Sequence, residues 1–372
     1  MDLPVYLDHN ATTPLAAGVL DTMTRYLRDE FGNPSSGHHY GQAPRKALAT
    51  ARAQVAELLG VQPEQVLFTG CGSEANTLAI CGVTAGRTGH VITQATEHPA
   101  VLETCRALTA HGIRLTVLPV DGHGLVRPAD LAEALTDDTL LVSVMHANNE
   151  TGTIQPIAEL AALAHDAGAL FHTDAAQTTG KLPYIVDDLG VDLLTIAGHK
   201  FGGPKGVGAL YLREGVTVQP VIRGGGQENG VRSGTENVAA IAGIGTAAEH
   251  ASTTLAARHA HLTASRDLLH RLLVEALGER VLLNGHPQRR LPNTLNVSIT
   301  GTVGTQVLAA IPQVAASTGS ACHDGSVSSP VLAAMGLGPG RVAAAIRLSV
   351  GSTTTEADIR YAASLLATAA GA

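Results

Sequence analysis

Short apolar runs recur along the first two thirds of the chain and alternate with segments of helical character. The runs are Val66-Leu67-Phe68, Val91-Ile92, Leu140-Leu141-Val142, Ala169-Leu170-Phe171 and Leu193-Leu194-Thr195-Ile196. Such runs, bounded by turn residues, are typical of buried strands. Between them, residues 45–59 have the spacing of an amphipathic helix. The alternation extends from about residue 60 to about residue 215, and it predicts an α/β fold with a mostly parallel sheet.

The last third of the chain has a different pattern. A long helical stretch begins at Val238 and ends near Leu277, and strand-like runs follow at residues 292–299 and 345–351. A chain of 372 residues suggests two domains at about 100–200 residues per domain. We therefore predict a large domain at residues 15–255. Residues 1–14 and 256–372 would together form a smaller α+β domain, with the long helix linking the two.

Composition narrows the classes of protein to consider. Hydrophobic residues make up 45% of the chain, but aromatic residues only 3%, so Ala, Val, Leu and Ile must build the core. The net charge of −8 argues against a nucleic-acid binder, which would normally show a basic stripe. No signal peptide is recognisable, and no apolar run approaches the roughly 20 residues that cross a membrane. We expect a cytoplasmic protein.

The four cysteines, Cys71, Cys81, Cys105 and Cys322, lack the close spacing of zinc ligands. A disulfide framework is also not expected in a chain of this size without a secretion signal. We therefore expect free thiols and no bound metal.

Two polar side chains follow neighbouring apolar runs at the ends of predicted strands. Asp174 ends one run, and Lys200 follows the next run within Gly198-His199-Lys200-Phe201-Gly202. The carboxyl ends of parallel strands face one crevice, so the two side chains can meet. Burial lowers the pKa of a lysine and leaves an amine that can form a Schiff base with an aldehyde. Pyridoxal phosphate needs this pair, because the lysine holds its aldehyde and the acid keeps its pyridine nitrogen protonated.

The segments HTDAAQ at residues 172–177 and GHKFGGPKG at residues 198–206 resemble the cofactor site of the cysteine desulfurase family. These are fold-type-I pyridoxal phosphate enzymes related to class V aminotransferases, with a mostly parallel seven-stranded sheet in the large domain. The resemblance covers roughly residues 5–365. It implies that Lys200 binds the cofactor, Asp174 pairs with the pyridine nitrogen and Gln177 forms a hydrogen bond with the phenolic oxygen.

Further motifs match the cofactor site of the same family. The glycine turn before residue 74 lets a helix N-terminus hold an anion, and the resemblance implies that Gly72, Ser73 and His199 contact the cofactor phosphate. His98 would stack on the ring and move protons to or from the substrate thiol. Asn149 would lie near the phenolic oxygen and the substrate carboxylate. Thr235 would reach the phosphate of a partner subunit, which implies a homodimer with shared active sites.

Three residues are implied in substrate chemistry. Asn10, in the opening segment of residues 6–14, would border the substrate carboxylate. Arg347 stands alone among apolar residues, where a guanidinium suits a bidentate carboxylate, and the family's arginine here binds the α-carboxylate. Cys322, within Gly319-Ser320-Ala321-Cys322, matches the family's nucleophile. His323 beside it could favour the thiolate.

The resemblance implies conversion of L-cysteine to L-alanine, with sulfur carried as a persulfide on Cys322. The acceptor would be an iron–sulfur scaffold, a tRNA-thiolation factor or another thiol. One departure is Ala197, where many members carry a phosphate-binding serine. Together with Ala321-Cys322-His323-Asp324, it resembles the selenocysteine lyase branch, which is the main alternative.

Two further alternatives come from other classes. A silent sulfur-carrier subunit with this fold should have lost some of the catalytic set, which this chain retains. A conventional aminotransferase would not need Cys322.

Overall fold

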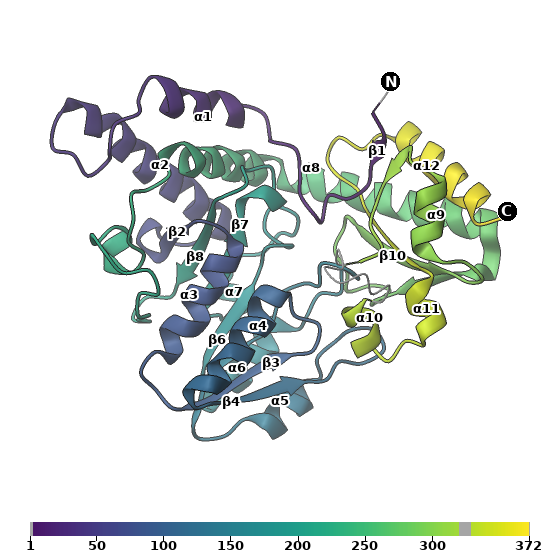
Figure 1. The fold of residues 1–372 in the computed structure, drawn as a ribbon, viewed down its shortest axis with the longest axis horizontal. Coiled ribbons are helices and arrows are strands. Elements are labelled where there is room, and N and C mark those ends of the chain that lie inside the picture. Colours follow the sequence, from purple (N-terminus) through teal and green to yellow (C-terminus); the bar gives the residue numbers. More distant parts are fainter. Residues whose placement is uncertain (1–2, 320–328, 372) are drawn as a thin grey trace.

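A seven-stranded sheet forms the centre of the larger part of the molecule (Figure 1). The computed structural model describes residues 3–319 and 329–371. The strand order is β2-β8-β7-β6-β5-β3-β4, and β8 is antiparallel to both of its neighbours while the other pairs are parallel. The bounds are β2 Val66–Thr69, β3 Gly89–Gln94, β4 Ile113–Leu118, β5 Thr139–Ser143, β6 Leu170–Asp174, β7 Leu193–Ala197 and β8 Gly208–Leu212. The predicted α/β class and mostly parallel sheet are confirmed.

The apolar side chains of these strands pack against two layers of helices, one on each face of the sheet. Leu141 and Leu193 belong to the cluster of buried residues formed with α3 (Gly72–Thr84) and α4 (Pro99–Leu108). Their neighbours Val142 and Leu194 belong to the cluster on the opposite face, because successive side chains of a strand point to opposite sides. That face is covered by α1 Val19–Arg28, α2 Gln42–Leu59, α6 Ile157–Asp166, α7 Val186–Leu189 and the first half of α8 Val238–Leu277. Helix α5 spans Pro128–Ala134.

A second cluster of buried side chains lies in the smaller part of the molecule. It surrounds a three-stranded antiparallel sheet with the order β12-β10-β9, and α8 extends into both parts (Figure 1). The bounds are β9 Val281–Asn284, β10 Thr294–Ile299, β12 Ala345–Ser349, α9 Gly304–Ala310, α10 Pro330–Ala334, α11 Pro339–Ala343 and α12 Glu356–Ala369. Leu7 and Leu262 belong to this cluster, whereas Val19 and Ala251 belong to the cluster on the large sheet that also contains Val142 and Leu194. This division supports the boundaries proposed above, which remain a proposal.

The N-terminal segment joins the two parts. Strand β1 (Val5–Tyr6) pairs in parallel with β11 (Val314–Ala315), and the Ser349 N–H donates to the Leu7 carbonyl at 2.7 Å. A few residues later, the Thr13 N–H donates to the His199 carbonyl at 3.0 Å. The segment is therefore hydrogen-bonded to β12 on one side and to the chain after β7 on the other.

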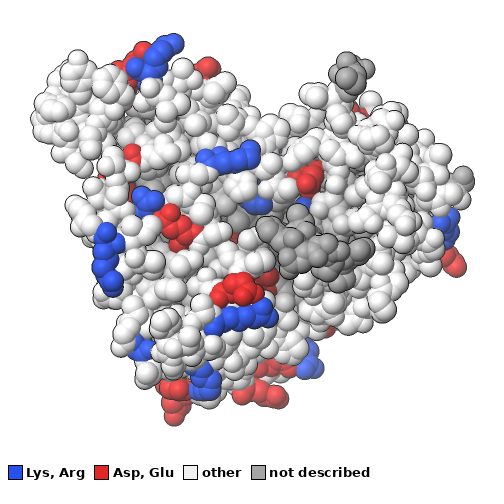
Figure 2. All heavy atoms as spheres, in the orientation of Figure 1, with Lys and Arg blue, Asp and Glu red and all other residues white. Residues whose placement is uncertain are grey.

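The surface carries charges of both signs. On the face shown in Figure 2, acidic and basic side chains are interspersed. Of the helices in the described ranges, none combines the length and apolar character needed to cross a bilayer.

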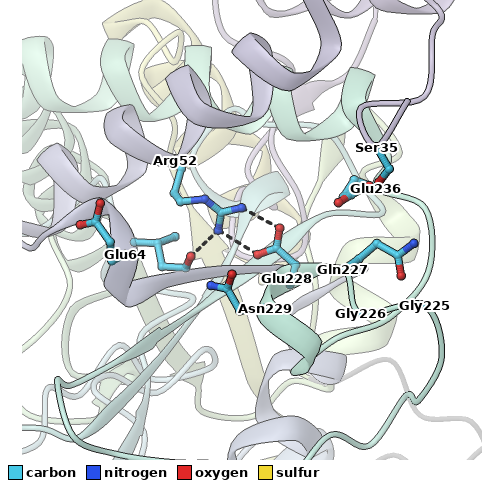
Figure 3. A pocket seen from close by; sticks show the side chains of 10 residues that line it. Ser35, Arg52, Glu64, Gly225, Gly226, Gln227, Glu228, Asn229 and Glu236 are labelled. Atoms are coloured by element: carbon cyan, nitrogen blue, oxygen red, sulfur yellow. Dashed lines mark hydrogen bonds and ion pairs between the residues drawn. The ribbon is translucent and has the colours of Figure 1, made fainter. Parts of the chain in front are cut away.

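A buried ion pair attaches the loop before α8 to the large sheet. Arg52 on α2 donates from both terminal nitrogens to the Glu228 carboxylate, at 2.6 and 2.8 Å, and also to the Val66 carbonyl (Figure 3). Glu228 in turn accepts from the Phe68 N–H at 2.9 Å. Glu228 and Asn229 have φ values of 47° and 56°, a left-handed backbone that is costly for residues other than glycine. The ion pair therefore holds a strained turn in place.

Removing Glu228 should destabilise the protein by about 1.5–3 kcal/mol, because the half-buried Arg52 loses charge-assisted hydrogen bonds. We expect this loss for Glu228→Leu in urea unfolding of the cofactor-free protein. The double variant Arg52→Met/Glu228→Leu should be more stable than Glu228→Leu alone, since no bare guanidinium remains. A double variant that shows the full sum of the two single losses would contradict the coupling.

Candidate active site

The amine of Lys200 lies at the carboxyl end of β7, in a short helical turn of Gly198–Lys200. Its Nζ donates to the carbonyl oxygens of Asn10 at 2.6 Å and Ala11 at 2.9 Å. Burial lowers the pKa of Lys200 to about 8; the positive charge of Arg347 also lowers it, whereas Asp174 and Asp8 raise it. A substantial fraction of this lysine is therefore a neutral nucleophile slightly above neutral pH.

Asp174 ends the neighbouring strand β6 and pairs with Thr195 of β7. Its side chain is 7% exposed. One carboxylate oxygen accepts from Asn76 Nδ2 at 2.7 Å, and the other accepts from the Ala176 N–H at 2.9 Å. A carboxylate has about four lone-pair positions, so it can accept a further N–H from a ligand. Asn76, on α3, was not identified as a site residue from the sequence.

Helix α3 begins at Gly72 at the same edge of the sheet. Cys71 caps it, because its Sγ accepts from the Glu74 N–H at 3.4 Å. A Cβ on Gly208 would lie 2.7 Å from the Cys71 carbonyl carbon, so only glycine lets the turn approach β8. The first N–H groups of α3, including those of Gly72 and Ser73, have no intrahelical acceptor and can hold an anion.

Ala197 packs directly beneath this turn. A Cβ on Gly72 would lie 3.1 Å from the Ala197 Cβ, and Ala197 itself is buried. The residue that replaces the usual serine therefore lies against the turn at Gly72.

His98 precedes α4 and caps it. Its Nδ1 accepts from the Ala100 N–H at 3.1 Å, which leaves Nε2 available. The residue is exposed to solvent at its surface, but the surrounding protein desolvates the ring and lowers its pKa. The positive charge of Lys200 also lowers this pKa, whereas the negative charge of Asp174 raises it. The ring is thus neutral near Asp174 and Lys200, and its proton lies on Nε2, which can donate.

Gln177 and Asn10 meet beside the lysine. Gln177 Nε2 donates to the Asn10 carbonyl at 3.0 Å, so that oxygen accepts from Gln177 and from Lys200. The Asn10 side chain is only 1% exposed and donates to Thr294 Oγ1 at 2.8 Å and to the Asn149 carbonyl at 3.1 Å. Asn10 therefore faces the lysine with its backbone, while its side chain is engaged within the protein.

Arg347 lies on β12 and is 4% exposed. Its Nη2 pairs with Asp8 at 2.7 Å, and its Nη1 donates to the Asn149 carbonyl at 3.2 Å. Its Nε is buried and has no hydrogen-bond acceptor in the described part of the chain. An unused N–H on a buried guanidinium fits an additional carboxylate. The partner Asp8 was not identified from the sequence.

Three predicted residues remain, His199, Thr235 and Cys322. His199 lies next to Lys200, and its Nδ1 is 3.2 Å from Thr12 Oγ1. Burial, with the charges of nearby lysines, lowers its pKa to about 4, so its ring is neutral. Thr235 is exposed on the loop before α8, and no hydrogen bond within residues 3–319 and 329–371 joins it to the other site residues. Cys322 lies outside the described residues.

The arrangement fits pyridoxal phosphate by its donor and acceptor chemistry. A reactive amine, a buried carboxylate with spare acceptor capacity and a helix N-terminus with unused N–H groups meet at one edge of the sheet. These groups match the aldehyde, the pyridinium nitrogen and the phosphate of that cofactor, respectively.

Comparison with known proteins gives consistent matches over nearly the whole chain. The sequence profile of the family "Aminotransferase class-V" matches residues 5–361. The chain is 46% identical to "Cysteine desulfurase IscS" of Dictyoglomus turgidum, over 98% of this chain and 94% of that protein. It is 42% identical to "Cysteine desulfurase IscS" of Methanosarcina thermophila, over 95% of this chain and 89% of that protein.

Two solved structures with a similar fold also cover nearly the whole chain. The structure of a "NIFS-LIKE PROTEIN" has a TM-score of 0.92 at 36% identity, covering 98% of this chain and 99% of that chain. "SspA in complex with cysteine" has a TM-score of 0.83 at 35% identity, covering 94% and 99% of the two chains.

The reactivity of Lys200 should follow its lowered pKa. In the cofactor-free protein, we expect the rate of Schiff-base formation with pyridoxal to rise with pH and to reach half its maximum at about pH 8, rather than near the ordinary lysine value of 10.5. Arg347→Met should move this midpoint upward, since it removes a positive charge. Asp174→Asn should move it downward. Absorbance stopped-flow would measure the rate, with Lys200→Ala as the blank; a midpoint near 10.5 would refute the assignment.

Proposed function

Because the chain belongs to the cysteine desulfurase family within the class-V aminotransferases, we propose that it converts L-cysteine to L-alanine and passes the sulfur to an acceptor. The observation that carries this proposal is the proximity of three groups, since Asp174 and Arg347 both act on the charge of Lys200. They are the Lys200 amine with a pKa of about 8, the buried Asp174 carboxylate and the Arg347 guanidinium, whose Nε–H finds no acceptor among residues 3–319 and 329–371.

We propose pyridoxal phosphate as the cofactor. When bound, it draws electrons from the amino acid and so makes bonds at and next to Cα breakable. The residues proposed to hold it are Gly72, Ser73, His98, Asn149, Asp174, Gln177, His199 and Lys200, with Thr235 contributed by the other subunit. Asp174 would accept the pyridine N–H, and its hydrogen bond from Asn76 keeps the carboxylate oriented for this.

The chain's own residues would position and deprotonate the substrate. Arg347 donates to the α-carboxylate, and Asp8 and Asn149 keep the guanidinium in place. Asn10 contributes through its backbone, which holds Lys200 beside the substrate Cα. Lys200 Nζ then takes the Cα proton. His98 is neutral because its pKa is lowered, and its proton lies on Nε2 because Nδ1 accepts from Ala100; it would give this proton to the substrate or take it back.

Cys322 would complete the reaction. Its thiolate attacks the substrate sulfur, so that an S–S bond forms while the Cβ–S bond breaks, and alanine leaves after a proton is added at Cβ. This assignment rests on the match of residues 319–322 to the family motif. The outer sulfur of this persulfide then passes to an acceptor. The proposed acceptors are an iron–sulfur scaffold or a tRNA-thiolation factor, and the proposed location is the cytoplasm.

A homodimer is part of the proposal. Large apolar side chains are exposed on α1 and in the loop after it: Leu20 by 62%, Leu27 by 67%, Phe31 by 68% and Tyr40 by 60%. The Phe31 and Tyr40 rings contact each other, with centroids 5.8 Å apart. Exposed apolar residues that lie together mark interaction surfaces. Sedimentation velocity tests the proposal, since a monomer at micromolar concentration would exclude it.

The selenocysteine lyase alternative is not favoured. The curated relatives quoted above are named cysteine desulfurases. Ala197 also has a packing role, because its methyl group supports the turn at Gly72.

The assay is alanine formation from L-cysteine and from L-selenocysteine, side by side. We expect substantial turnover of cysteine, no turnover by Lys200→Ala, and none by Cys322→Ala with cysteine. Arg347→Ala should lower kcat/KM by about 10- to 100-fold, the value of a hydrogen bond to a charged group. Turnover of selenocysteine alone, or cysteine turnover that survives in Cys322→Ala, would overturn the proposed function.

A further inference from the structure

Lys181 is a buried lysine to which the proposed chemistry gives no task. It lies four residues after Gln177, and only 4% of it is exposed. Its Nζ donates to Gln177 Oε1 at 2.8 Å. Burial lowers its pKa, and the positive charges of Lys200, Arg258 and Arg347 lower it further. Within residues 3–319 and 329–371, no ion pair offsets the cost of burying this lysine.

The contact of Lys181 determines how the Gln177 amide is held. The Asn10 carbonyl can only accept, so the Gln177 nitrogen must face it, at 3.0 Å. Gln177 Oε1 is then directed away and needs a donor, because an unsatisfied buried acceptor costs about 1–3 kcal/mol. Lys181 supplies that donor. Within residues 3–319 and 329–371, the second N–H of Gln177 Nε2 has no acceptor, and it lies beside the carbonyl that also binds Lys200.

A cavity of about 270 Å³ adjoins this arrangement. Lys181, Lys200 and Arg258 border it. Water in such a space can accept the N–H groups of Lys181 that Gln177 does not use. The side chain can therefore keep one hydrogen bond to the protein without a carboxylate partner.

We propose that Lys181 is a positioning residue that acts through Gln177. It fixes the amide so that Gln177 presents an N–H, and not its oxygen, to the phenolic oxygen of the bound cofactor. This inference rests on the proposed function, in which Gln177 contacts that oxygen. A donor at this position stabilises the deprotonated phenolic oxygen, so its loss should make the bound cofactor titrate at higher pH.

The test compares Lys181→Met, Gln177→Ala and the double variant in two measurements. The first is the dissociation constant of pyridoxal phosphate, and the second is the pH midpoint of the absorbance band of the bound cofactor. We expect each single variant to bind about 2- to 10-fold more weakly, the range of one hydrogen bond, and to show a raised midpoint. In the Gln177→Ala background, Lys181→Met should change neither value.

The outcomes separate the inference from the proposed function. A further rise of the midpoint in the double variant would mean that Lys181 acts by its own charge, which overturns the proposal. An unchanged midpoint in Lys181→Met also overturns it, while leaving the proposed function intact. Wild-type protein that does not bind pyridoxal phosphate would refute the proposed function itself.

Two further variants complete the design. Lys46→Met, at an exposed lysine on α2, is the matched control and should behave as wild type. If thermal melting shows that Lys181→Met does not fold, Lys181→Gln keeps a side-chain donor. A wild-type midpoint in that variant supports the proposal, and a midpoint equal to that of Gln177→Ala contradicts it.

Discussion

The hydrogen bonds from Lys200 Nζ to the Asn10 and Ala11 carbonyls are the contacts on which the rest of the site depends. They hold a buried amine against a segment that belongs to neither sheet. That segment is attached through Leu7 to Ser349 and through Thr13 to His199. The lysine, contributed by the large sheet, and Arg347, contributed by the small one, are therefore positioned relative to each other by a single short stretch of backbone.

The placement of Lys200 determines its pKa. Burial is the main cause of the lowered pKa of Lys200; the positive charge of Arg347 lowers it further, whereas Asp174 and Asp8 raise it. This environment, buried and beside the Arg347 guanidinium, keeps the amine of Lys200 reactive near neutral pH. It also suits a cofactor and a substrate that both carry negative groups, which would restore the balance of charge in the crevice.

Much of the fold is evident from the pattern of apolar residues. Continuous runs predicted the parallel strands because residues buried on both faces leave no polar alternation, and the long helix was predicted at its observed bounds of Val238–Leu277. The strand-end residues Lys200 and Asp174 followed from the same pattern. The partners Asn76 and Asp8 did not, because they lie 98 and 339 positions from the residues they orient, and no local period records such contacts. The contact between Lys181 and Gln177 could have been predicted, because side chains four residues apart in a helical turn are neighbours.

The most direct test of this account is to identify the lysine that binds the cofactor. The chain has four lysines, Lys46, Lys181, Lys200 and Lys205, so reduction with borohydride in the presence of pyridoxal phosphate, followed by peptide mass spectrometry, gives an unambiguous answer. The account predicts stoichiometric labelling of Lys200 alone at pH 8. Labelling of Lys181 in its place, or equal labelling of the exposed Lys46 and Lys205, would contradict it.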